Sequence, residues 1–247
     1  MTGGAGPVDE RPGRRAKLSG LMMTYALMQT TMEAPPVEAL RKAFLTSTAL
    51  SPADAVFVAD DAYGILARDL QGEDAQNIAA SLAADGVHVE LVAEGDLPRL
   101  PEPAMFVGFQ FRDHFLRLLN ALGEPTDVPY RGIRLVAVGY DRQAVRIELV
   151  FGDATLRYNS TLEHLAFRHE PTMQGRSPGE NLVAMLEQLR RRIPTAVFNR
   201  GAHNIADGPP VEHIEDFVAY PRTSAFFEEV VWLLWKLRRD EGPVLAG

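Results

Sequence analysis

The chain contains no cysteine among its 247 residues. This absence excludes disulfide bonds, thiolate nucleophiles, and zinc or iron–sulfur sites held by cysteine. A chain without disulfides is ordinary in a reducing compartment, and we expect a cytoplasmic protein. A secreted protein that lacks disulfides would have the same composition, so this expectation rests on absence alone.

Long apolar runs are also absent. The longest near the end, from Val230 to Trp235, is six residues, whereas a bilayer-spanning helix needs about 20. We identify no serine nucleophile elbow and no phosphate-binding loop ending in Lys-Ser/Thr. We therefore expect no membrane span, no cofactor and no metal, and we favour a protein that is not an enzyme. Several enzyme classes carry no local motif, so an enzyme stays an open alternative.

Basic residues are scarce in one part of the chain. Between Met22 and Glu94 there are eleven acidic residues and only three basic ones, so this segment accounts for the net charge of −8. An acidic surface repels phosphate backbones, which argues against nucleic-acid binding. It predicts a protein partner with a basic surface, unless the charge serves solubility alone.

Residues 22–95 are predicted to form a domain with the order strand, helix, helix, strand, helix, strand, preceded by a disordered leader over residues 1–21. A capping Ser51 with Pro52 begins the second helix. The third helix carries an apolar stripe from Ala75 to Ala83 and ends before Gly86. We expect this domain to fold alone as a three-stranded sheet covered by three helices.

This order and the landmarks between Leu70 and Leu91 resemble the C-terminal domain of the bacterial ribosomal stalk protein, whose fold a protease adaptor shares. The resemblance covers about a third of the chain. The stalk family recruits translation factors through a glycine- and lysine-rich stretch, but here Thr48 to Ala55 contains neither residue. The resemblance thus implies a fold that works by protein contact, without the factor-binding face.

A proline-rich linker over residues 96–103 leads to a second domain, residues 104–194. Short strands at about ten-residue spacing predict an antiparallel barrel or sandwich, followed by an amphipathic helix from Ser177 to Ile193. This order resembles the pleckstrin-homology-like barrel, which implies a protein-binding or lipid-headgroup-binding domain. A basic patch is predicted from Arg131, Arg134, Arg142 and Arg146. The fold class of the whole chain is predicted as α+β.

The segment over residues 195–247 is predicted as a wrapping loop followed by a C-terminal helix. The loop groups polar residues that would form a functional cluster: Asn199, Arg200, His203, Asn204 and His213. Their spacing matches no metal motif. The helix, Ser224 to Asp240, has a wide apolar face that must pack against another surface, either within the chain or in a homodimer.

The function expected from the sequence is a non-enzymatic, two-domain interaction or adaptor protein. Two alternatives stay open. One is binding of a small molecule or lipid headgroup by the second domain, and the other is an unrecognised enzyme that uses the region from His203 to His213.

Overall fold

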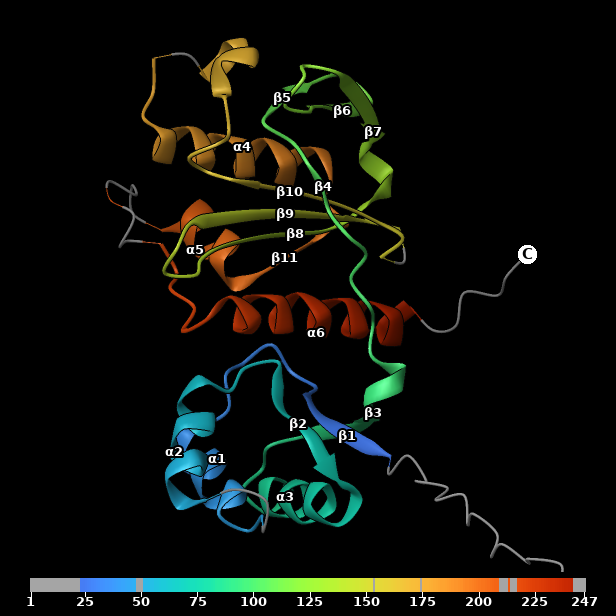
Figure 1. The fold of residues 1–247 in the computed structure, drawn as a ribbon, viewed down its shortest axis with the longest axis vertical. Coiled ribbons are helices and arrows are strands. Elements are labelled where there is room, and N and C mark those ends of the chain that lie inside the picture. The colour runs from blue at the N-terminus through green and yellow to red at the C-terminus, as the bar shows by residue number, and fades with distance from the viewer. Residues whose placement is uncertain are drawn as a thin grey trace, which may run out of the picture.

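The computed structural model describes residues 23–47, 51–152, 154–173, 175–208, 213 and 217–241. The predicted leader, residues 1–21, lies outside them. The chain has the α+β fold that the sequence predicts, arranged as two units with the C-terminal helix between them (Figure 1).

The first unit has the predicted order of elements. These are β1 (Thr24–Gln29), α1 (Val37–Phe44), α2 (Pro52–Asp61), β2 (Ile65–Gln71), α3 (Gly72–Ala84) and β3 (Val89–Ala93). The sheet order is β2-β1-β3, and both pairs are antiparallel. Ser51 caps α2, because its hydroxyl accepts a 3.2 Å hydrogen bond from the Asp54 N–H. Gly86, at φ +78°, follows the end of α3.

Helices α1, α2 and α3 cover one face of this sheet. Their shared core includes Leu27 of β1, Leu40 and Phe44 of α1, and Ile78 and Leu82 of α3, all fully buried or nearly so. Helix α2 contributes only two buried residues, Ala55 and Ala59. Two of its larger apolar side chains, Val56 and Phe57, are exposed.

The second unit contains two sheets. Its strands are β4 (Ala104–Met105), β5 (Gly108–Phe111), β6 (Phe115–Leu119), β7 (Pro125–Pro129), β8 (Ile133–Tyr140), β9 (Val145–Phe151), β10 (Leu156–Thr161) and β11 (Val197–Phe198). They pair in the orders β11-β8-β9-β10-β4 and β5-β6-β7. The described strands thus form a sandwich-like pair of sheets, and they do not close into the barrel that was one of the two predicted forms.

Helix α4 (Pro178–Arg192) covers the second unit's core as predicted. Its residues Leu182, Met185, Leu186 and Leu189 are buried against both sheets. Ser177 and Glu180 form a reciprocal capping box at its start, which satisfies two backbone N–H groups at the helix end.

Helix α6 (Thr223–Glu241) lies between the two units (Figure 1). Its core includes Ala26, Met28 and Ile65 from the first sheet and Leu135, Ala137 and Val150 from the second. Trp232, Leu233 and Leu234 of α6 are at most 3% exposed. The wide apolar face is therefore covered within the chain, which is the intramolecular alternative of the prediction, and not left open for a homodimer.

One predicted segment has more secondary structure than expected. The segment over residues 195–220 is not a continuous loop, because it contains β11 and helix α5 (Arg200–Asp207). Leu97 of the predicted linker is 7% exposed and packs in the core around α6. The first unit also uses α6 to cover its second sheet face, so the predicted independent domain lacks part of its cover.

None of the helices in the described ranges combines the length and the apolar character that crossing a membrane would require.

Candidate functional site

Asn199 lies in the structure as a helix cap, fully buried at the start of α5. Its side-chain oxygen accepts hydrogen bonds from the N–H groups of Val138 (2.9 Å) and Ala202 (3.0 Å). Its amide nitrogen donates to the Val138 carbonyl and to the Tyr220 hydroxyl, both at 3.0 Å. All of its hydrogen-bonding capacity is used by the protein, so Asn199 has a structural role.

Arg200 continues this network toward the first unit. Its guanidinium forms a 3.1 Å ion pair with the buried Glu229 of α6, which also accepts a 2.7 Å hydrogen bond from the Tyr220 hydroxyl. Burial, with the neighbouring Glu229 carboxylate, raises the pKa of Tyr220. The guanidinium also lies 3.6 Å from the ring centroid of Tyr63. The network joins α5, α6 and the first unit.

The His203 side chain, also in the predicted cluster, contacts other residues. His203 is half exposed, and its Nδ1 lies 2.5 Å from Arg190 Nη2 and 3.6 Å from the Asp207 carboxylate. Asn204 and His213 are exposed. In the described residues, no three His, Asp or Glu side chains are placed to hold a metal ion. The five residues are thus not gathered into one catalytic cluster.

The four predicted arginines are not brought together either. Arg131 and Arg134 lie where β8 begins, whereas Arg142 and Arg146 lie at the turn between β8 and β9 and just beyond it. The two pairs occupy opposite ends of one hairpin. Arg146 is also neutralised, because it forms an ion pair with the buried Asp141.

One motif was not recognised from the sequence. Residues 175–179 have the Gly-x-Ser-x-Gly spacing of a nucleophile elbow, with Ser177 in the nucleophile position. Such an elbow requires a preceding strand, but the described element before it is the short 3-10 turn Pro171–Met173. The Ser177 hydroxyl accepts a hydrogen bond from the Glu180 N–H. The motif is explained by the cap of α4.

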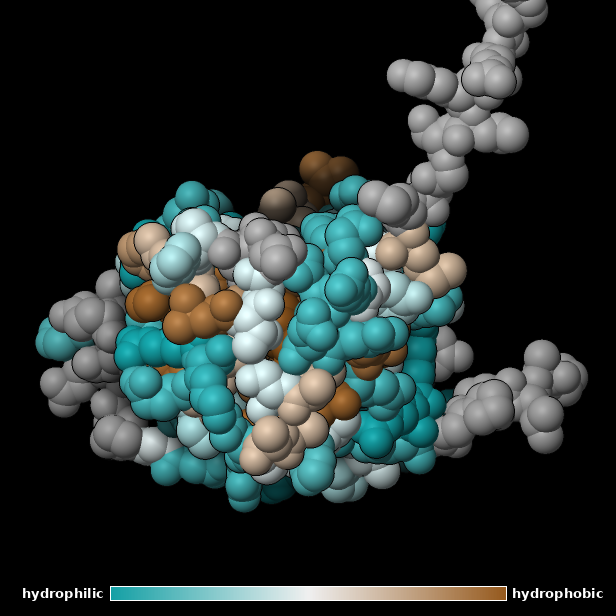
Figure 2. All heavy atoms as spheres, turned by 90° about the horizontal axis from the view of Figure 1, so that it is seen from below, coloured by the Kyte–Doolittle hydropathy of each residue, from teal (hydrophilic) through white to brown (hydrophobic). Residues whose placement is uncertain are grey.

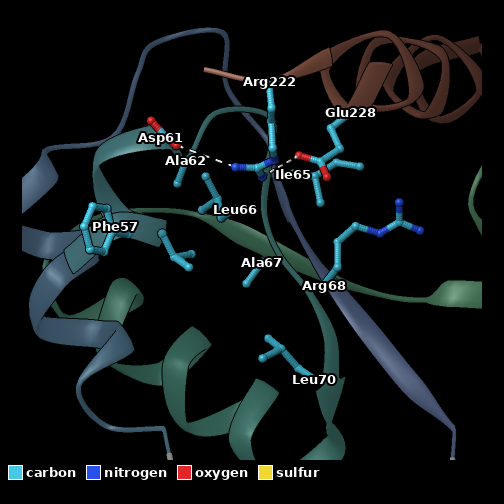
Figure 3. Close-up of a pocket in the computed structure, with 11 residues that line it drawn as sticks. Phe57, Asp61, Ala62, Ile65, Leu66, Ala67, Arg68, Leu70, Arg222 and Glu228 are labelled. Atoms are coloured by element: carbon cyan, nitrogen blue, oxygen red, sulfur yellow. Dashed lines mark hydrogen bonds and ion pairs between the residues drawn. The ribbon is translucent and has the colours of Figure 1, made fainter. Parts of the chain in front are cut away.

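The best candidate site is a pocket between α2, the edge strand β2 and the start of α6. Figure 3 shows Phe57 on α2 at one side and Leu70 of β2 at the far end. The pocket has a volume of about 240 Å³. Its lining is apolar along Phe57, Val58, Ala62, Ile65, Leu66, Ala67 and Leu70, and charged at Asp61, Arg68, Arg222 and Glu228.

The charged groups of this pocket are held in ion pairs. Arg222 lies 3.6 Å from Asp61 and 3.4 Å from Glu228 (Figure 3). Arg68 pairs with Glu94 at 2.5 Å. Burial raises the pKa of Glu228 despite its arginine neighbours. Because these groups are held in ion pairs, the pocket presents no isolated acid or base for catalysis.

The apolar surface beside the pocket is exposed. Phe57 has 74% of its surface open to solvent, and Val56 next to it has 40%. Figure 2 views the molecule from the side of the first unit, and apolar surface gathers at the left, where α1 and α2 lie in Figure 1, within a largely hydrophilic face. This site was not predicted from the sequence. The sequence signal for it was Phe57, an aromatic residue that does not belong to the buried face of α2 formed by Ala55 and Ala59.

Strand β2 is an irregular edge. Its pairing with β1 shifts register twice, and Asp69 has φ +57°. Such bulges bend an edge strand away from simple pairing with another strand. The pocket is therefore better suited to receive a side chain than to add a strand to the sheet.

The chain matches no protein-family model, no curated protein and no solved structure. The resemblances to the ribosomal stalk domain and to the pleckstrin-homology-like barrel accordingly stay predictions. The function must be argued from the surface of the molecule.

Proposed function

We propose that this protein is a non-enzymatic interaction module that binds a basic, partly apolar segment of a partner protein at the α2–β2 pocket. The observation that carries the proposal is the exposure of Phe57 beside this pocket. Exposed aromatic residues next to a concave apolar surface are typical anchors of protein interfaces.

The charge of the first unit supports a basic partner. Each of its basic residues is already paired internally: Arg41 with Glu38 and Asp60, Lys42 with Asp85, and Arg68 with Glu94. Residues 22–94 contain eight more acidic than basic residues, and two of the acidic ones, Asp61 and Glu90, pair with Arg222 and Arg239 from outside this segment. An acidic surface of this kind speeds the association of basic partners, and the effect is screened over about 10 Å at 0.1 M salt.

The size of the pocket supports a protein partner. Small-molecule sites usually measure about 300–1,000 Å³, and this pocket measures about 240 Å³. It is thus of a size to take one apolar side chain of a larger partner. The acidic surroundings would contact basic residues that flank that side chain.

Selection from a displayed peptide library, with the full chain as the target, tests this proposal. We expect enrichment of peptides in which an aliphatic or aromatic residue lies among Lys and Arg. The variants Phe57→Ser and Asp61→Asn should weaken their binding. The matched control is Leu122→Ser, because Leu122 is 83% exposed in the second unit.

Two further measurements make the outcome decisive. Association rates of the selected peptides should fall with rising salt, and a photo-crosslinker at position 57, but not at position 122, should capture them. Selected peptides that ignore the Phe57 and Asp61 variants, or a selection that yields no basic peptides, would refute the proposal.

A further inference from the structure

A second, larger pocket lies in the other unit, far along the chain from Phe57. It has a volume of about 700 Å³ and is lined by three separate segments: residues 113–115 before and in β6, residues 129–131 at the end of β7 and just after it, and residues 192–195 at the end of α4 and just after it. Its volume lies within the range of small-molecule sites.

Tyr130 gives this pocket a fixed wall. Its ring is buried, with 7% of the residue exposed, and its hydroxyl donates a 2.9 Å hydrogen bond to the Arg112 carbonyl oxygen. Its N–H donates to the His114 carbonyl oxygen at 3.3 Å. Because both ends of Tyr130 are anchored, the wall is preformed.

Two arginines from different elements line the pocket. The Arg192 guanidinium lies 5.3 Å from the ring centroid of Phe111 and 5.7 Å from that of Tyr130, so aromatic rings hold it in place. Arg131 belongs to the short 3-10 turn Tyr130–Gly132. Among the described residues, neither guanidinium forms an ion pair, whereas the neighbouring Arg190 and Arg191 pair with Asp207 and Glu187.

The end of α4 explains only part of this arrangement. A helix C-terminus favours cations in its last turn, which accounts for Arg192. It does not account for Arg131, which lies on another element. The pocket also contains His114, and Asp113 is its only acidic lining residue. Two guanidiniums that line one pocket give it a positive charge, which favours the binding of an anion.

We propose that this pocket binds a phosphate group of a small ligand through Arg131 and Arg192. Guanidinium groups donate paired hydrogen bonds to phosphate oxygens, and two of them match a doubly charged anion. Since the negative end of the α4 dipole disfavours an anion on the helix axis, the phosphate lies toward Arg131. This inference is independent of the proposed function. It concerns a basic pocket in the second unit, whereas the proposed function concerns an acidic surface of the first unit.

The test is an NMR titration of the ¹⁵N-labelled full chain with inorganic phosphate, with ionic strength held constant by sodium chloride. We expect saturable shifts confined to residues 113–115, 130–131 and 192–195. Arg131→Gln and Arg192→Gln should each weaken binding about tenfold, since each removes a charge-assisted hydrogen bond. Arg192→Lys keeps the charge and should retain more affinity than Arg192→Gln.

Arg142→Gln is the matched control, because Arg142 is an exposed arginine at the other end of the β8–β9 hairpin. Vesicles of phosphatidylcholine with and without phosphatidic acid form a second arm, which distinguishes a lipid phosphate from a free one. Binding in either arm that both glutamine variants weaken supports the proposal. Binding in neither arm, shifts that do not saturate, or equal affinity in Arg131→Gln, Arg192→Gln and Arg142→Gln would overturn it.

Discussion

The indole Nε1 of Trp232 donates a 2.7 Å hydrogen bond to the backbone carbonyl oxygen of Gln29, across 203 positions of sequence. The bond is buried and joins α6 to the end of β1. Four residues further along α6, the Lys236 ammonium donates to the Thr30 carbonyl oxygen at 3.0 Å. Tyr63 contacts the Trp232 ring edge-on, with centroids 5.2 Å apart. The C-terminal helix is thereby fixed to the first sheet.

Replacing Trp232 should destabilise the protein strongly. Trp232→Ala removes a fully buried ring and leaves the Gln29 carbonyl oxygen unpaired, so we expect a loss of about 3–5 kcal/mol in the free energy of unfolding. Trp232→Phe keeps most of the buried area and should cost less. Urea denaturation measures both. Phe57→Ala, at an exposed site, should change stability by no more than about 0.5 kcal/mol; equal losses for Trp232→Ala and Phe57→Ala would contradict the packing described.

Gly64 should be far less tolerant of alanine than Gly86. Both have positive φ, +74° and +78°. A Cβ at Gly64 would lie 2.8 Å from Trp232 Cδ2, whereas one at Gly86 would meet no atom within 4 Å. We expect Gly86→Ala to cost about 1 kcal/mol from backbone strain, and Gly64→Ala to cost about 1–3 kcal/mol more from overpacking. Thermal unfolding of the two variants gives the comparison, and a matching cost would show that Trp232 can move aside.

The fragment of residues 22–95 should not fold stably by itself. Without α6, its sheet exposes Ala26, Met28 and Ile65, which are at most 5% exposed in the full chain. We expect broad, poorly dispersed NMR signals from this fragment. Fusing residues 217–241 to it through a flexible linker should restore dispersion, because α6 then covers the open face. A well-dispersed spectrum from the fragment alone would instead support the independent domain predicted from the sequence.

The stability of the protein should decrease as pH rises toward and through 7, because of Glu148. Its carboxylate is 1% exposed, and neither oxygen has a hydrogen-bond partner, although Arg157 lies 3.4 Å away. Burial raises the pKa of Glu148 from an ordinary 4.5 to about 7. The folded state therefore binds this proton more tightly than the unfolded state.

This contribution is fully present below about pH 4.5 and is lost as pH rises through 7. Its size is roughly 3 kcal/mol, at about 1.4 kcal/mol per pKa unit. Urea denaturation at several pH values, compared with Glu148→Gln, isolates it from other titrating groups. The free energy of unfolding of the glutamine variant should decline less steeply with pH than that of the unmodified protein. Equal slopes for the two proteins would show that Glu148 has an ordinary pKa.

The order of elements in the first unit was predictable because its signals are local. Ser51 and Pro52 begin a helix, and apolar spacing and Gly86 define the next one. Helix α5 was missed because its sequence, Arg-Gly-Ala-His-Asn-Ile, is polar and short. The capping Asn199 was a usable signal, and it was interpreted as part of a polar cluster instead.

The position of α6 could not be predicted in the same way. Its apolar face shows that it must be buried, but the partner surface depends on contacts such as Trp232 with Gln29, which no local pattern encodes. The candidate pocket likewise depends on three elements that meet only in the folded chain: Phe57 on α2, Leu70 on β2 and Arg222 before α6. The aromatic character of Phe57 was visible; its exposure was not.

The order of synthesis gives the placement of α6 a further consequence. Helix α6 covers one face of the β2-β1-β3 sheet and one face of the five-stranded sheet. A ribosome translates the strands of these two sheets before it reaches Thr223, so neither of the two faces can be covered by α6 while the strands are being made. Exposed apolar faces of this kind are the surfaces by which nascent chains aggregate or recruit chaperones. A premature stop codon anywhere before Thr223 would therefore damage both halves of the molecule at once, including the half that had been translated completely.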